Sequence, residues 1–356
     1  MGTPYETRVA WYPTTSPGDT APLEAFLDDL PLPRLRRLLV LGKTEGTASA
    51  NDFGRDFALA ALGQSLAARG GGDLVARATV IMSMGTEGIA TPGLTLLAAL
   101  DGAPAPGLAL GAARSAPLQP DQVTGPDHVE AVIAATEAAR AEAGLHPDEV
   151  VLVLVKSPVL TPERAALLPR ATRQRAASTA ASRAVAALAV GVALGEVPPE
   201  RIEAALAGDD DAHARRCMAS SGTETLAVEV AVLGNRGTGG VRTIHGAVLG
   251  DLIDRRAVVQ CLRQAGLAFD ADGVLVDAAR VPAAFFKAGS TTDGRMRGLR
   301  TTVASSEVAP DKQLRAAASG FVAGLLGHTR TFISGGAEGQ VPPGGSLFAC
   351  IVEADG

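Results

Sequence analysis

A short serine motif occurs three times in the chain. The pattern Ser-x-Gly-(Thr/Ala)-Glu begins at Ser83, at Ser220 and at Ser334. Its glycine lets the backbone turn sharply behind the hydroxyl and leaves N–H groups free to face a ligand oxygen, as an oxyanion hole requires. The motif therefore predicts three serines presented for nucleophilic or oxyanion-binding chemistry.

A lysine closes an apolar run upstream of each serine, at Lys43, Lys156 and Lys287. A lysine can act as the base of a Ser–Lys pair when burial and nearby positive charge lower its pKa enough to leave it uncharged. Three arginines could supply that charge: Arg55, Arg183 and Arg315. The alternative is that duplication simply copied an ordinary strand-end lysine and turn serine.

The elements that position these residues recur in one order. An apolar run ending in the lysine predicts a strand covered on both faces. An Ala-rich stretch with helical spacing and an arginine near its start comes next, and a second short strand leads to the serine. The lysine strands are expected at 38–43, 150–156 and 281–287, the helices at 56–68, 184–194 and 316–326, and the serine strands at 79–82, 217–219 and 331–333.

This order predicts an α/β fold (α+β units) in which three internally repeated sheet-and-helix units surround a pseudo-threefold axis. We expect the units at residues 1–105, 112–250 and 255–356, with linkers rich in Pro, Gly and Ala at 101–126 and near 238–254. Further helices are expected at 128–143 and 252–265, the second stopping before Gly266.

Composition limits the functional class. The 356 residues are 47% hydrophobic and 20% charged, which indicates an ordered globular protein. A formal net charge of −6 and 3% aromatic residues argue against a nucleic-acid partner. The apolar stretches are shorter than the about 20 residues that span a bilayer, and no secretory signal precedes them. We therefore expect no membrane partner, a cytoplasmic location and three reduced, buried cysteines.

Other motifs are incomplete. Gly42-Lys43-Thr44 lacks the leading glycine of a phosphate-binding loop, because position 37 is Arg. The five histidines lack metal-ligand spacing, and the acidic run at 209–211 lacks the later ligands of a calcium-binding loop. We interpret all of these as structural.

Taken together, the motifs resemble the cyanuric acid hydrolase and barbiturase family of ring-opening cyclic amidohydrolases. The resemblance covers essentially the whole chain. It rests on the segments GKTEG at 42–46, NDFGR at 51–55, SMGTEG at 83–88, VKSP at 155–158, SSG at 220–222, SGGAEG at 334–339 and VPPGG at 341–345.

The resemblance implies a three-unit fold with a central barrel-like β core, helices outside and the active site on the axis. It implies hydrolytic opening of a cyclic imide ring, with cyanuric acid as substrate and a carboxylated biuret as product. The middle pair would be catalytic, with Ser220 as nucleophile and Lys156 as base. The substrate would be bound by Lys43, Arg55, Ser83, Met84, Arg183, Ser221, Lys287, Arg315, Ser334 and Gly335.

The chain departs from the family pattern at a metal site. The resemblance implies a structural Mg²⁺ or Ca²⁺ on the last loop, with ligands at Ala337, Gln340, Val341, Pro342 and Gly345. Gly289 stands where the family has a glutamate that helps to hold the ion, so only neutral oxygens would remain, a poor set for a hard cation. We expect the chemistry to require no cofactor.

Three functions stay open from the sequence. The first is a cyanuric acid amidohydrolase. The second is a barbiturase, which has the same Lys, Arg and Ser set but opens barbiturate to ureidomalonate. The third is a ligand-binding member of the family without catalysis, suggested by the unusual residues Met84 and Gly289. The resemblance also suggests a homo-tetramer.

Overall fold

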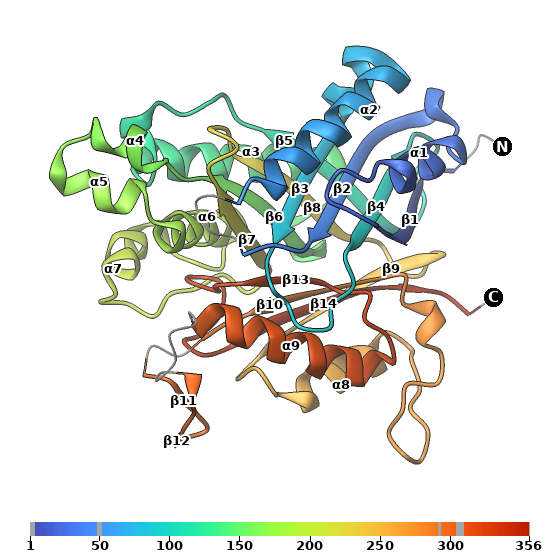
Figure 1. Ribbon diagram of the computed structural model, residues 1–356. Coiled ribbons are helices and arrows are strands. Elements are labelled where there is room, and N and C mark those ends of the chain that lie inside the picture. The colour runs from blue at the N-terminus through green and yellow to red at the C-terminus, as the bar shows by residue number, and fades with distance from the viewer. Residues whose placement is uncertain (1–3, 48–51, 291–292, 304–309, 356) are drawn as a thin grey trace.

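The computed structural model describes residues 4–47, 52–290, 293–303 and 310–355. Asn51, the first residue of one motif, lies outside these ranges. The main body contains three four-stranded sheets of mixed parallel and antiparallel pairing. Figure 1 shows the sheets toward the middle of the molecule, with helices on their outer sides.

The first sheet has the strand order β1-β4-β2-β3. Only the β2–β3 pair is parallel, because α2 connects these two strands. Helices α1 and α2 pack on the outer face of the sheet and form a shared apolar core with it. The bounds are β1 (Glu6–Pro13), α1 (Ala21–Asp28), β2 (Leu35–Thr44), α2 (Gly54–Arg77), β3 (Ala78–Met84) and β4 (Gly93–Leu100).

The second sheet has the equivalent order β5-β8-β6-β7, again with a single parallel pair. Helices α3 and α6 cover its outer face. The bounds are β5 (Gly107–Arg114), α3 (Pro126–Ala143), β6 (Val150–Pro158), α4 (Pro162–Ala166), α5 (Arg170–Ala176), α6 (Thr179–Ala193), α7 (Ile202–Ala207), β7 (Cys217–Gly222) and β8 (Glu229–Arg236).

The third sheet, β9-β14-β10-β13, repeats this order once more and packs on α8 and α9. The bounds are β9 (Arg242–Leu249), α8 (Arg255–Gln264), β10 (Ala283–Ala288), α9 (Pro310–Leu326), β13 (Phe332–Gly335) and β14 (Ser346–Glu353). A small hairpin joins β11 (Arg295–Met296) to β12 (Leu299–Arg300). Short 3₁₀ turns lie at Leu32–Arg34, Pro120–Gln122, Pro147–Glu149, Pro199–Arg201 and Ala278–Arg280.

The inner faces of the three sheets share one apolar core. It combines Leu39 of the first sheet, Leu110 and Leu154 of the second, and Phe285 and Leu347 of the third. Each sheet is thus covered on both faces, as the apolar lysine strands predicted. Backbone hydrogen bonds nevertheless close no barrel among the described strands, which form separate sheets.

The expected elements are present, with two corrections. Both segments interpreted as linkers contain a strand: β5 lies within 101–126 and β9 within 238–254. Their Gly- and Ala-rich or mixed composition hides the strand periodicity, so these two strands were not expected. Since β9 pairs with β14, the third sheet begins before residue 255. The division of the chain into domains stays a prediction.

Two further sequence expectations concern the helices and the cysteines. No single helix in the described ranges is long and apolar enough to cross a membrane; only α5 and α6 together reach that length, and they are bent by 77°. Cys217, Cys261 and Cys350 are free and buried, as expected.

Candidate active site

The three motif serines line one small cavity of about 160 Å³. An apolar cavity of about 150 Å³ is known to hold benzene, so this space has the size of a six-membered ring. Its walls are mostly polar, unlike those of an apolar ligand pocket. The lining residues are Arg55, Met82, Ser83, Met84, Lys156, Thr179, Arg183, Ser220, Ser221, Asp311, Lys312, Arg315, Ser334 and Gly335.

The serines reach this cavity from three different sheets. Ser83, Ser220 and Ser334 lie within the last three residues of β3, β7 and β13, respectively, and each of these strands is an edge strand. The hydroxyl of Ser83 donates to the carbonyl oxygen of Ile333 at 3.3 Å, which links the first sheet to the third. The sheet edges that carry the serines therefore meet at the cavity.

The backbone behind Ser83 and behind Ser334 presents an N–H group to this edge. Gly85 N donates to Thr44 O, and Gly336 N donates to Ala288 O, so both amides face their own sheet. Because successive N–H groups along a strand point to opposite sides, the amides of Met84 and Gly335 point to the open edge. Such free amides are suitable donors for an oxyanion.

The lysines stand beside the serines in the parallel strand pairs. Strand register places Lys43 opposite Ser83, Lys156 opposite Ser220, and Lys287 opposite Ser334. In two pairs the lysine Nζ contacts the serine Oγ, at 3.3 Å for Lys43 and 3.0 Å for Lys287.

The middle pair is arranged differently. The hydroxyl of Ser220 donates to Val155 O at 3.3 Å, and Lys156 Nζ donates to Met82 O at 3.4 Å. Of the three lysines, Lys156 is the one that lines the cavity, and Ser220 is more exposed than Ser83 or Ser334.

Burial makes all three lysines easier to deprotonate. It lowers the pKa of Lys43 to about 8, against the opposing effect of Glu87. It also lowers the pKa of Lys156, which Glu224 partly opposes. Burial, reinforced by the charge of Arg183, holds the pKa of Lys287 well below its ordinary value. Each lysine therefore has the environment that a neutral base needs.

The arginines come from helix α2, α6 or α9 and reach across to a different sheet. Arg55 Nη1 donates to Ser221 O of the second sheet at 3.3 Å. Arg183 donates two hydrogen bonds, at 2.8 and 2.9 Å, to Glu338, which follows β13 of the third sheet. Arg315 donates one, at 2.7 Å, to Glu87, which follows β3 of the first sheet. The contacts run first to second, second to third and third to first, so the three sheets are joined in a ring.

The glutamate that ends each serine motif also belongs to the site, a role that was not predicted from the sequence. Glu87 and Glu224 each contact a site lysine, and Glu338 contacts a site arginine. The signal was present in the repeat, since a carboxylate recurs four residues after every serine. Its meaning was not visible because the partner arginines lie far away in sequence.

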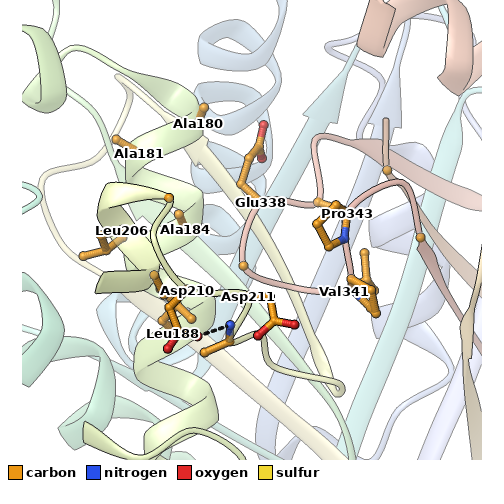
Figure 2. Close-up of a pocket in the computed structure, with 18 of the residues that line it drawn as sticks. Ala180, Ala181, Ala184, Leu188, Leu206, Asp210, Asp211, Glu338, Val341 and Pro343 are labelled. Atoms are coloured by element: carbon orange, nitrogen blue, oxygen red, sulfur yellow. Dashed lines mark hydrogen bonds between the residues drawn. The ribbon is translucent and has the colours of Figure 1, made fainter. Parts of the chain in front are cut away.

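A larger pocket of about 660 Å³ lies elsewhere, between α6, the 205–212 segment and the 337–345 loop. Figure 2 shows Ala180, Ala184 and Leu188 on one side and Val341 and Pro343 on the other. None of the motif serines or site lysines lines it. The smaller cavity is therefore the candidate active site, because the reactive groups converge there.

The residues on the last loop do not suit a hard divalent cation. The side chain of Gln340 is engaged: its Oε1 accepts from Ala219 N at 2.9 Å, and its Nε2 donates to Gly336 O at 3.1 Å. A Cβ atom added at Gly289 would lie 1.8 Å from Gly345 O, so the backbone leaves no room for a glutamate there. In the described ranges no cluster of three His, Cys, Asp or Glu residues could hold a metal.

The chain belongs to the amidohydrolase ring-opening protein family (Amido_AtzD_TrzD), whose sequence profile matches residues 8–353. This confirms the family resemblance. A cyanuric acid amidohydrolase of Methylobacterium sp. (strain 4-46) is 40% identical over 99% of this chain and 98% of its own length. A cyclic amide hydrolase of Azorhizobium caulinodans is 36% identical over 96% of this chain and 97% of its own.

Two solved structures share the fold. A crystal structure of cyanuric acid hydrolase from A. caulinodans has a TM-score of 0.87, with 32% identity over 99% of this chain and all of the other. A second cyanuric acid hydrolase structure, described as an evolutionary innovation by structural concatenation, has a TM-score of 0.86, with 28% identity over 98% of this chain and all of the other. The mixed α/β architecture is thus that of cyanuric acid hydrolases.

Proposed function

We propose that this chain is a cyanuric acid amidohydrolase, which opens the ring of a cyclic imide by hydrolysis. The observation that carries the proposal is the convergence of three serines and three arginines on one ring-sized cavity. Relatives of that name align over nearly the whole chain.

The symmetry of the substrate supports this choice. Cyanuric acid has three carbonyls alternating with three ring nitrogens, so three equivalent sets of donors could each hold one edge. The equal strand order of the three sheets supports three repeat units around a pseudo-threefold axis, with the cavity on that axis. Each arginine would donate to a carbonyl oxygen, and the serine hydroxyls with the amides of Met84, Ser221 and Gly335 would complete the site.

Ser220 is the nucleophile and Lys156 the base in this proposal. Ser220 is the most exposed of the motif serines, and Lys156 lines the cavity. The Ser220 hydroxyl must turn from Val155 O toward Lys156 Nζ, and catalytic hydrogen bonds often tighten only in the complex with substrate.

The reaction has two halves. Neutral Lys156 takes the proton of Ser220 Oγ as the oxygen bonds to a ring carbonyl carbon, and the carbonyl electrons move to an oxyanion held by backbone N–H groups. The intermediate collapses, the C–N bond breaks, and Lys156 returns the proton to the leaving nitrogen. Water then attacks the acyl-serine, Lys156 takes a water proton, and that proton returns to Ser220 Oγ as it leaves. The product, a carboxylated biuret, loses carbon dioxide without further help.

Barbiturate opening to ureidomalonate is the second candidate reaction, because it uses the same groups with a ring CH₂ in place of one NH. The unusual Met84 lines the cavity, where its side chain would contact the ring CH₂ of barbiturate. A ligand-binding protein without catalysis is the third candidate.

The remaining features of the proposal concern cofactors, partners and location. We propose that the chemistry needs no metal, since the serine and lysine supply the nucleophile and base and the last loop offers only neutral oxygens. We propose small cyclic imides as the binding partners, and we propose no binding to nucleic acid or to membranes. The homo-tetramer and the cytoplasmic location stay predictions.

Steady-state assays with cyanuric acid and with barbiturate test the function. We expect turnover of cyanuric acid by the wild type and a loss of about a thousandfold or more in kcat for Ser220→Ala and for Lys156→Met. Ser83→Ala and Ser334→Ala are matched controls that remove equivalent hydroxyls and should retain more activity. Turnover of barbiturate alone would favour the second candidate. Equal inactivity of wild type and Ser220→Ala, with thermal stabilisation by cyanuric acid, would favour the third.

A further inference from the structure

The three motif carboxylates are shared unequally between lysine and arginine. Glu87 serves both partners: its oxygens lie 2.5 Å from Lys43 Nζ and 2.7 Å from Arg315 Nη1. All three side chains are nearly inaccessible to solvent. The first site is therefore a buried triad in which one carboxylate bridges the lysine and the arginine.

In the third site the carboxylate binds the arginine. Glu338 holds the Nε and Nη2 atoms of Arg183 in a two-bond clamp. Lys287 forms no ion pair among the described residues, and its Nζ contacts Ala219 O at 2.6 Å and Ser334 Oγ at 3.0 Å. Two donor atoms of this arginine, Nε and Nη2, are thus bound to protein before any substrate arrives.

In the second site the carboxylate binds the lysine. Glu224 forms a close ion pair with Lys156, whereas Arg55 Nη2 lies 3.7 Å from the other oxygen. The buried Nε of Arg55 has no hydrogen-bond partner in the described part of the chain. An unsatisfied buried donor costs free energy, so a hydrogen bond from this guanidinium to an incoming oxygen is favourable.

We propose that Glu224 is the positioning residue that selects the middle pair for chemistry: it holds Lys156 at the cavity and binds Arg55 only loosely, so that this arginine can turn to an anionic oxygen of the ring. The inference rests on the proposed function and deepens it. Three sites that look equivalent in sequence thereby become one working site and two binding sites. The required substrate is a cyclic imide whose ring oxygens carry negative charge, either in the bound anion or as the oxyanion forms.

The charged groups around Lys156 determine what removal of this carboxylate does. Lys156 faces Glu224 after β7, Arg55 on α2 and Glu229 on β8. Burial lowers the pKa of Lys156, and Glu224 is the strongest opposing influence. Without the Glu224 charge the pKa of Lys156 falls further, because Arg55 repels the ammonium and only Glu229 still favours it.

The pH dependence of kcat/KM for cyanuric acid tests this role. A base must be deprotonated, so activity rises with pH through the pKa of Lys156. In Glu224→Gln we expect this acid limb to move to lower pH by about one to three pH units, the range for loss of a nearby opposite charge. Glu338→Gln is the matched control: it removes the equivalent carboxylate, which contacts Arg183, and should leave the position of the limb unchanged.

The arginine half is tested by binding without turnover. In a Ser220→Ala background, calorimetric Kd values for cyanuric acid are compared after adding Arg55→Met or Arg183→Met. We expect Arg55→Met to weaken binding about tenfold more, because a charge-assisted hydrogen bond to substrate is lost there, whereas Arg183 is held by Glu338.

The outcomes separate the inference from the proposed function. A wild type that does not turn over cyanuric acid refutes the function. An active wild type whose acid limb stays in place in Glu224→Gln, or moves equally in Glu338→Gln, refutes the inference alone, as do equal losses of affinity for the two arginine variants. If Glu224→Gln does not fold, Glu224→Asp withdraws the carboxylate by one methylene and should move the limb in the same direction by less.

Discussion

Lys43 gives the protein a stability that rises with pH, and Lys43→Met should remove that rise. The lysine is 5% exposed, and its pKa falls from an ordinary 10.5 to about 8 on folding. Between these two values the unfolded chain binds more protons than the folded one. Unfolding free energy therefore increases with pH across this window.

The size of the effect follows from the two pKa values. At about 1.4 kcal/mol for each tenfold change in proton affinity, the interval from about 8 to 10.5 corresponds to about 3 kcal/mol. The cost of keeping the folded lysine charged is fully present below about pH 8 and is gone above about pH 10.5. Glu87 retains Arg315 as a partner at 2.7 Å after the substitution, so the variant still has a neutralised carboxylate.

Urea unfolding at a series of pH values from 7 to 10.5, at one fixed protein concentration, measures this difference. We expect the free energy of wild type minus that of Lys43→Met to rise by about 3 kcal/mol between pH 8 and 10.5. Lys156 and Lys287 remain in both proteins, so their own titration cancels. Lys312→Met, which changes a partly exposed lysine at the cavity wall, is the control and should keep the wild-type slope. A difference that is flat across this window would refute the linkage of Lys43 burial to its proton affinity.

Two further predictions concern the last loop and its neighbour Gly289. Gly289→Ala should lower the free energy of unfolding by about 1–3 kcal/mol, because the added Cβ would lie 1.8 Å from the Gly345 carbonyl oxygen. Gly320→Ala in α9 is the control for the same urea experiment. Nothing lies within 4 Å of its added Cβ, so this substitution should be neutral or stabilising. Treatment with EDTA followed by gel filtration should leave both Tm and kcat unchanged, because the carbonyl oxygens of Ala337 and Pro342 and the side chain of Gln340 already accept hydrogen bonds within the protein. A fall in Tm that Mg²⁺ or Ca²⁺ restores would contradict a metal-independent loop.

Much of the fold could be predicted because its signals are local. The continuous apolar run at 150–156 lies within β6, and the Ala-rich run that follows Arg183 forms most of α6, so both elements lie close to where they were expected. Strands β5 and β9 were missed because their sequences lack a clear apolar alternation and their partners lie far along the chain. Pairing with β8 and β14, respectively, rather than intrinsic propensity, makes them strands.

The sequence singled out residues that the structure brings close together, but not the contacts between them. The repeated motifs identified the serines, lysines and arginines, and the structure brings the serines, the arginines and Lys156 to one cavity while Lys43 and Lys287 stand behind their serines. The partners of Arg55 and Arg315 lie far away in sequence: Glu224 and Glu87, respectively, are more than 150 residues from them. No spacing rule within a unit encodes those pairs.

The amino-acid sequence by itself determined which side chains recur and on which strand or helix each one sits, because hydrophobic periodicity and turn residues act over short distances. Only the tertiary structure decided which arginine meets which carboxylate. Three sheets that pack their inner faces on one apolar core must exchange side chains across their edges, and the small differences in that packing make Glu87, Glu224 and Glu338 unequal. Electrostatic interactions between buried groups depend steeply on distances of this kind, so motifs that share the same Ser, Gly and Glu acquire different partners.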